Sequence, residues 1–238
     1  MITVYLDESE HSTASKYMAV AGFYGDDKQW TAFSSDWKGA LGSRKALHMN
    51  ALRISSKPER AKRLIDALGP LPYKHGLKSI CSAVKFADYA DLIQDGSDGH
   101  AKRALAGYPT CLGSVLLALN QLVPGNESIK IVCEDQKQYA EAAIRTFRAM
   151  RMGMSHPAKP YFSGMEFIPK NSSILTEPAD CLAYAVTHSL ENPKSIVSSI
   201  CRPILGDGSV GGYKLSRDVI REMVLKTKYI VKRDRIKW

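Results

Sequence analysis

The chain has 238 residues, of which 45% are hydrophobic and 24% are charged. This balance is ordinary for a folded protein with a sizeable core. The formal net charge of +9 is not ordinary, and it favours a polyanionic partner such as nucleic acid without itself showing binding. The longest apolar stretch, Cys111 to Val123, is too short to span a bilayer. No basic segment followed by an apolar one opens the chain, so we expect a cytoplasmic protein that does not enter a membrane.

The five cysteines are widely spaced, and none forms a CxxC pair. This spacing argues against a zinc site and against a disulfide framework. Free cysteines in apolar surroundings behave as small core residues, which suits a reducing compartment.

The first predicted elements form a β-hairpin followed by a helix. Ile2–Leu6 is apolar and β-branched, and Tyr17–Tyr24 is its expected antiparallel partner. A helix is predicted to start at Asp26 or Asp27, with an apolar stripe at helical spacing. The stripe consists of Trp30, Phe33, Trp37 and Leu41.

The remainder of the chain alternates between helices and strands. A second helix is predicted over Lys57–Leu68, with Ser55 or Ser56 as its N-cap and Gly69-Pro70 as its end. The later predicted elements are a strand at Lys78–Phe86, a loop at Asp95–Gly99, a helix at about Thr110–Leu122, a strand at Ile129–Cys133, a helix at Gln136–Arg151, a strand at Met165–Ile168 and a helix at Pro178–Leu190. This order predicts one α/β domain over residues 1–238, with a mixed sheet covered by helices on both faces.

Two segments stand apart from this alternation. Residues from about 26 to 70 would form a helical insertion between the second and third strands. Residues from about 214 to 238 form a basic C-terminal extension, in which Lys226–Trp238 surrounds the apolar Tyr229–Val231 with six basic side chains. This end of the chain is either an edge strand lined with charge or an arm that contacts phosphates.

Six acidic residues fall in pairs at the ends of predicted strands or at the start of a helix: Asp7 and Glu8, Glu134 and Asp135, and Glu177 and Asp180. Sites in open α/β sheets form outside the carboxyl ends of strands. Asp7 and Glu8 would point to opposite faces of the sheet, so only one of them should be the main site residue. Glu177 and Asp180 share one helical face.

Each acidic pair also has a structural explanation, as an N-cap or as a charge that complements a helix dipole. Their joint occurrence favours a metal site, because converging carboxylates repel one another. Mg²⁺ and Mn²⁺ prefer carboxylate oxygens. One or two such ions can activate a water molecule and stabilise the oxygen that leaves phosphorus.

Two motifs resemble the domain-of-unknown-function 3800 family. Tyr5-Leu6-Asp7-Glu8-Ser9 is similar to the tyrosine-aspartate-glutamate-serine-glycine motif that opens the family. Thr176–Tyr184 is similar to its closing glutamine-x-x-aspartate motif. Glu10 stands where the family commonly has glycine, and Glu177 where it commonly has glutamine. The resemblance covers roughly residues 2 to 190, and it implies a ribonuclease H-like fold with helices before the third strand.

The resemblance also implies site residues. Asp7 corresponds to the aspartate of the first strand and Asp180 to the aspartate of the helix. The acid of the fourth strand is Glu134 or Asp135, and the choice between them stays open at this point. Glu177 would add a further ligand or replace a positioning amide.

Other candidate residues are accessory. His48 could approach the site as a proton donor, although a loop histidine is more often structural, and the same holds for His11. Lys170 could contact a phosphate, and Glu8 is a further accessory acid. The chain has no P-loop, dinucleotide-binding or nucleophile-elbow motif.

We therefore expect a metal-dependent phosphodiesterase, a nuclease that uses Mg²⁺ or Mn²⁺ and binds nucleic acid. The alternative is a non-catalytic nucleic-acid or protein-interaction module of a phage or defence system. An actin-like or sugar-kinase ATPase ranks lower, since those proteins need two ribonuclease H-like cores and this chain is short for two. The sequence makes no prediction of oligomeric state.

Overall fold

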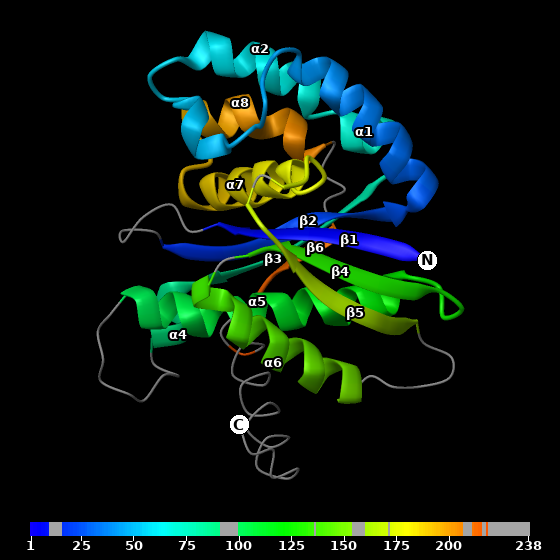
Figure 1. Cartoon of the computed structure of the whole chain (residues 1–238). Helices are drawn as coiled ribbons and strands as arrows, with labels where there is room; N and C mark the ends of the chain where they lie inside the picture. Colours follow the sequence, from blue (N-terminus) through cyan, green and yellow to red (C-terminus); the bar gives the residue numbers. More distant parts are fainter. Residues whose placement is uncertain are drawn as a thin grey trace.

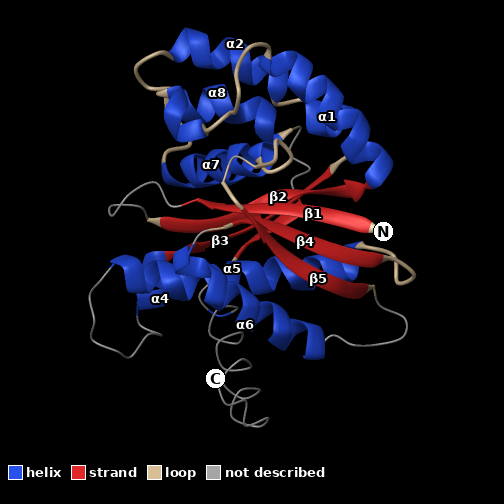
Figure 2. Ribbon diagram, viewed as in Figure 1, coloured by secondary structure: helices blue, strands red, loops and turns tan. Residues whose placement is uncertain are grey.

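The centre of the fold is a six-stranded mixed sheet, shown as red arrows in Figure 2. The computed structural model describes residues 1–9, 16–90, 100–135, 137–153, 160–170, 172–206, 211–215 and 218. Its strands are β1 (Ile2–Ser9), β2 (Tyr17–Asp26), β3 (Lys78–Lys85), β4 (Ser128–Glu134), β5 (Tyr161–Ile168) and β6 (Gly211–Lys214). They lie in the order β5-β4-β1-β2-β3-β6. The pairs β1–β2 and β2–β3 are antiparallel, whereas β1–β4, β4–β5 and β3–β6 are parallel.

Helices cover both faces of this sheet. They are α1 (Asp27–Leu41), the 3-10 helix η1 (Met49–Leu52), α2 (Pro58–Leu68), α3 (Leu71–Lys74), α4 (Phe86–Ala90), α5 (His100–Leu122), α6 (Lys137–Gly153), α7 (Glu177–Glu191) and α8 (Ile196–Leu205). In Figure 1, α4, α5 and α6 lie on one side of the sheet, and α7, α8, α1 and α2 lie on the other. The predicted α/β architecture, with a mixed sheet between helical layers, is confirmed. None of the helices in the described ranges combines the length and apolarity needed to cross a membrane.

Alternation along β1 separates two cores. Val4 and Leu6 belong to the cluster formed with α5 and α6. Tyr5 faces the opposite layer, where its ring meets the edge of Trp30 at a centroid distance of 4.6 Å. Because side chains alternate between faces, the sequence of β1 supplies one core with its even-numbered residues and the other with its odd-numbered ones.

The apolar stripe predicted for the first helix is confirmed in α1. Trp30, Phe33, Trp37 and Leu41 are all buried. The N-cap Asp26 accepts a hydrogen bond from the Gln29 N–H, and the Gln29 side chain accepts one from the Asp26 N–H, which makes a capping box. Trp30 also donates its indole N–H to the Thr3 carbonyl at 3.0 Å, so α1 is fixed directly on β1.

One glycine permits the close pairing of β1 and β2. Gly22 lies opposite Leu6 in the antiparallel register. A Cβ atom at Gly22 would lie 1.8 Å from the Tyr5 carbonyl oxygen. No side chain fits at that distance, so glycine is required beside the end of β1 that carries Asp7.

Several element ends differ from the predictions. The N-cap of α2 is Lys57, without a side-chain cap, so the predicted serine cap was wrong. Pro58 at the first helical position explains this start, because the helix needs no amide hydrogen there. α5 begins at His100 and not near Thr110, and Pro109 lies inside it. The helix tolerates Pro109 at the loss of one backbone hydrogen bond.

Other predictions meet the structure only in part. The segment between β2 and β3 is helical and contains α1, η1, α2 and α3. The short α3, α4, α8 and β6 were not predicted. The loop at Asp95–Gly99, the residues Glu10 and His11, and the basic segment Lys226–Trp238 lie outside the described residues. Of the predicted extension from about 214, the structure describes only residues 214, 215 and 218.

Candidate functional site

The carboxyl ends of β1 and β4 lie side by side. The two strands are parallel, with Leu6 opposite Cys133, so Asp7 and Glu134 follow at the same end of the sheet. Leu6 and Cys133 face the α5–α6 core. Their neighbours Asp7 and Glu134 therefore point to the α7 side, and both are buried, at 7% exposure.

The start of α7 is tied to the end of β4. The Thr176 hydroxyl donates to Glu134 Oε1 at 2.9 Å. The Thr176 carbonyl in turn accepts the Asp180 N–H at 3.1 Å. Farther along α7, the Thr187 hydroxyl reaches the Ser9 carbonyl of β1 at 3.4 Å. The two hydroxyl bonds tie the start of α7 to the end of β4 and a later turn to β1, on the face of the sheet where Figure 1 shows α7.

Asp180 is the more open acid of this group, with 24% of its side chain exposed. Its Oδ2 accepts the Met49 N–H at 3.0 Å. The same oxygen lies 3.7 Å from Nδ1 of His48. The structure thus brings the predicted accessory residue His48 to the predicted helix aspartate.

Burial is the largest cause that raises the pKa of Asp7 well above its ordinary value. The carboxylates of Glu8, Asp180 and Glu134 raise the pKa further, in that order. A hydrogen bond from the Glu8 N–H to Asp7 Oδ1, at 3.0 Å, acts in the opposite direction. Negative charge from three elements is therefore concentrated at a poorly solvated point, where a bound cation would relieve it.

These oxygen donors suit a hard divalent cation in their chemistry. As they lie, however, the described residues contain no group of three or more His, Cys, Asp and Glu side chains that could hold a metal ion. Glu134 and Asp180 each use an oxygen in the hydrogen bonds to Thr176 and Met49. Metal binding would thus require these side chains to draw closer together.

Glu177 is bound by a different set of donors. Its Oε2 accepts the indole N–H of Trp37 at 2.7 Å, and its carboxylate also accepts the Leu47 N–H. Burial is the main cause that raises the pKa of Glu177. The sequence signal for this contact was the tryptophan in the apolar stripe of α1, which brings a polar N–H into a core, but its partner could not be identified from the pattern.

The remaining predicted residues lie apart from the three acids. Asp135 is exposed, and its N–H donates to the Ile168 carbonyl at 2.8 Å. The structure therefore favours Glu134 as the acid of β4. Glu8 lies on the α5 side by alternation, where burial first, then Cys133 and the charge of Glu8, raise the pKa of Tyr108. Lys170 is exposed in the turn that follows β5.

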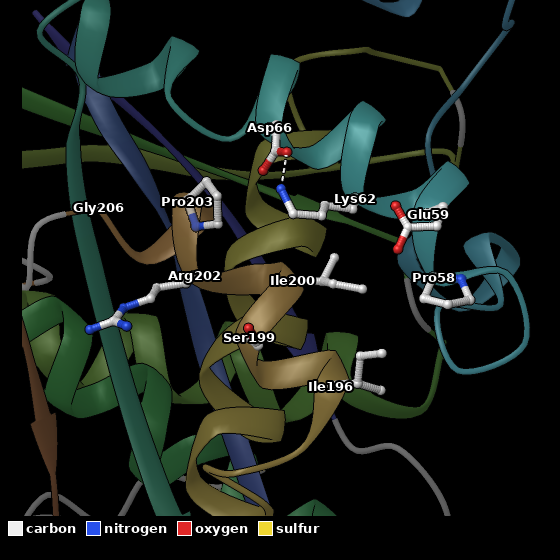
Figure 3. Close-up of a pocket in the computed structure, with 10 residues that line it drawn as sticks. All are labelled: Pro58, Glu59, Lys62, Asp66, Ile196, Ser199, Ile200, Arg202, Pro203 and Gly206. Atoms are coloured by element: carbon white, nitrogen blue, oxygen red, sulfur yellow. Dashed lines mark hydrogen bonds and ion pairs between the residues drawn. The ribbon is translucent and has the colours of Figure 1, made fainter.

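A separate groove lies between α2 and α8, with a volume of about 490 Å³. Figure 3 shows Ile196, Ile200 and Pro203 along it, with the Lys62–Asp66 ion pair on the α2 side. None of its lining residues is a predicted site residue. The groove therefore does not enlarge the acidic site.

The motifs around Asp7 and Asp180 are the features that resemble a known family. No model of a known protein family matches the chain, and no curated protein matches it. Membership of the domain-of-unknown-function 3800 family therefore stays a prediction that rests on these motifs. The functional argument depends on the geometry of the site itself.

Proposed function

We propose that this protein is a metal-dependent phosphodiesterase, a nuclease of the domain-of-unknown-function 3800 family with a ribonuclease H-like fold. Its catalytic carboxylates would be Asp7, Glu134 and Asp180. The observation that carries the proposal is their convergence from β1, β4 and α7 at one end of the sheet. The strand order, with β1 between the antiparallel β2 and the parallel β4, is compatible with such a fold.

The three carboxylates would have different tasks. A bound Mg²⁺ or Mn²⁺ would supply Lewis-acid stabilisation of the phosphate and a more acidic water. Asp7 is buried and its pKa is raised, so a cation would compete with a proton for this carboxyl. Glu134 and Asp180 are held near the strand ends by the Thr176 hydroxyl and the Met49 N–H, and both would shift from these donors toward Asp7 to bind the cation.

The charge of the chain supports a nucleic-acid substrate. A net charge of +9 attracts the phosphate backbone through a sequence-independent interaction that weakens with salt. The acidic site would otherwise repel a polyanion, so basic residues elsewhere on the chain must compensate for it.

A cleavage assay tests the proposal. The protein is incubated with single- and double-stranded DNA, RNA and an RNA–DNA hybrid, with Mn²⁺ or with EDTA. We expect cleavage only with metal, and a loss of at least about 100-fold in rate for Asp7→Asn and Asp180→Asn. Asp135→Asn is the matched control, since this exposed acid follows Glu134 directly, and it should retain the parental rate. Parental activity in the Asp7→Asn variant would contradict the site.

The second candidate is a non-catalytic nucleic-acid or protein-interaction module of a phage or defence system. It is favoured by the absence of a preformed three-residue metal group among the described side chains. Calorimetric titration with Mn²⁺ separates the two functions. No heat of binding at millimolar metal, together with binding of nucleic acid and no turnover, would favour the module.

A further inference from the structure

Two acids on the first turn of α7 hold one short segment of backbone. Glu177 accepts the N–H of Leu47, and Asp180, three residues later, accepts the N–H of Met49 at 3.0 Å. The two backbone groups flank His48. We call residues 47–49 the clamped segment. Because its hydrogen bonds end on carboxylates, they are stronger than bonds between neutral groups.

The clamped segment is also fixed by packing. The side chains of Leu47 and Met49 are 2% and 0% exposed. Only about 10 Å³ of space remains in the void that Leu47 lines with Trp37 and Pro178. The Trp37 indole holds Glu177 Oε2 at 2.7 Å, so the acid that holds Leu47 is itself held by α1.

His48 is the part of this segment that stays accessible. Its side chain is 28% exposed, and Nδ1 lies 3.7 Å from Asp180 Oδ2. Nε2 is on the far edge of the imidazole ring from Nδ1 and can act as a second hydrogen-bonding atom. The buried neighbours on both sides leave the backbone little freedom to move the ring away from the acidic site.

The geometry points to His48 as a substrate-contacting residue and to Glu177 as a positioning residue that is not a metal ligand. In this arrangement Glu177, with Trp37, places the clamped segment so that the imidazole meets a phosphate oxygen beside Asp180. The identity of the substrate as a phosphodiester rests on the proposed function. The clamp itself rests only on the contacts of Glu177, Asp180 and their partners.

The clamp can be tested without an activity. Amide hydrogen exchange is measured by NMR for Leu47 and Met49, with Ile131 in the middle of β4 as an internal reference. We expect Glu177→Leu to speed exchange at Leu47 by about tenfold or more, and Ile131 to be unchanged. Glu177→Gln keeps an acceptor oxygen and should retain most of the protection. If Glu177→Leu does not fold, Trp37→Phe removes the indole donor together with part of the buried ring and should give a smaller increase in the exchange rate at Leu47.

Metal affinity separates positioning from ligation. Calorimetry with Mn²⁺ should give a Kd for Glu177→Gln within about threefold of the parental value, because the variant loses no ligand. A tenfold or larger loss of Mn²⁺ affinity would show that Glu177 is a metal ligand and would overturn its assignment as a positioning residue. Unchanged exchange at Leu47 in both Glu177→Leu and Trp37→Phe would overturn the clamp.

The substrate contact is tested with a short single-stranded DNA oligonucleotide in EDTA, whose binding is measured by fluorescence anisotropy. His48→Ala should weaken binding by about three- to tenfold, whereas Asn50→Ala, an exposed neighbour on η1, should leave it unchanged. Parental binding by His48→Ala, or no binding by the parent, overturns the contact. A parent that binds but never cleaves with Mn²⁺ contradicts the proposed reaction, while the effect of His48→Ala still decides this inference.

Discussion

The two faces of the sheet are built from the same strands and differ in polarity. On the α5–α6 face, Val4, Leu6, Ile129 and Ile131 meet an apolar cluster that excludes water. On the α7 face, the alternate positions at the strand ends are Asp7 and Glu134. The first face is an apolar core with one acid, Glu8, at the end of β1, whereas the second is a core that becomes polar where α7 starts.

This difference teaches where the chain can tolerate charge. The carboxylates of the α7 face are buried or half-buried, and each has a donor that partly compensates for the lost water, namely the Glu8 N–H, the Thr176 hydroxyl, the Trp37 indole or the Met49 N–H. The α5–α6 face is mainly apolar and contributes packing. We therefore expect substitutions on the α5–α6 face to lower stability, and substitutions of the acids on the α7 face to change function.

The largest effect on stability should come from the backbone that both faces share. Gly22→Ala would place a methyl group 1.8 Å from the Tyr5 carbonyl oxygen, so β1 and β2 would have to separate. We expect a loss of at least about 3 kcal/mol in the free energy of unfolding by urea titration. Gly39→Ala is the control, since nothing lies within 4 Å of its added Cβ in α1. It should raise stability by about 0.5–1 kcal/mol. Equal changes in unfolding free energy for Gly22→Ala and Gly39→Ala would show that the close approach of β1 and β2 does not limit stability.

A smaller loss should follow from a cavity on the α5–α6 face alone. Leu116 is 0% exposed, and its neighbour Leu117 on α5 is 37% exposed. We expect Leu116→Ala to cost about 2–4 kcal/mol in unfolding free energy, and Leu117→Ala to change it by about 0.5 kcal/mol. Binding of Mn²⁺ should stay at the parental level in both variants. Reduced metal affinity in folded Leu116→Ala would mean that the two faces are not independent.

The smallest effect, and one of opposite sign, is expected at Asp7. Its pKa is raised in the folded state, so the folded protein binds this proton more tightly than the unfolded chain does. Below pH 3.8, the ordinary pKa of an aspartate, Asp7 is protonated in both states and does not change the free energy of unfolding. Above it, that free energy falls as pH rises through the folded-state pKa. In EDTA, Asp7→Asn should raise Tm at pH 7, and the gain should shrink toward pH 4. A gain in Tm that does not depend on pH, or an equal gain in Asp135→Asn, would argue against the raised pKa of Asp7 as the cause.

The local pattern of the sequence determined the elements near the site. The apolar, β-branched run Ile2–Leu6 and the helical stripe from Trp30 to Leu41 were sufficient to predict β1 and α1. The acids at the strand ends were visible because they directly follow such runs. α8, β6 and the start of α5 at His100, before Pro109, were not predicted, since their boundaries depend on packing against distant segments.

Only the tertiary structure showed which groups each acid contacts. Pairing of β4 with β1 places Glu134 beside Asp7 and leaves Asp135 exposed, and Glu177 meets Trp37, which is 140 residues away along the chain. The contact of Met49 with Asp180 joins residues 131 positions apart. Local sequence specifies which face of an element a side chain occupies, but it carries no information on which distant donor will meet that side chain once the layers pack.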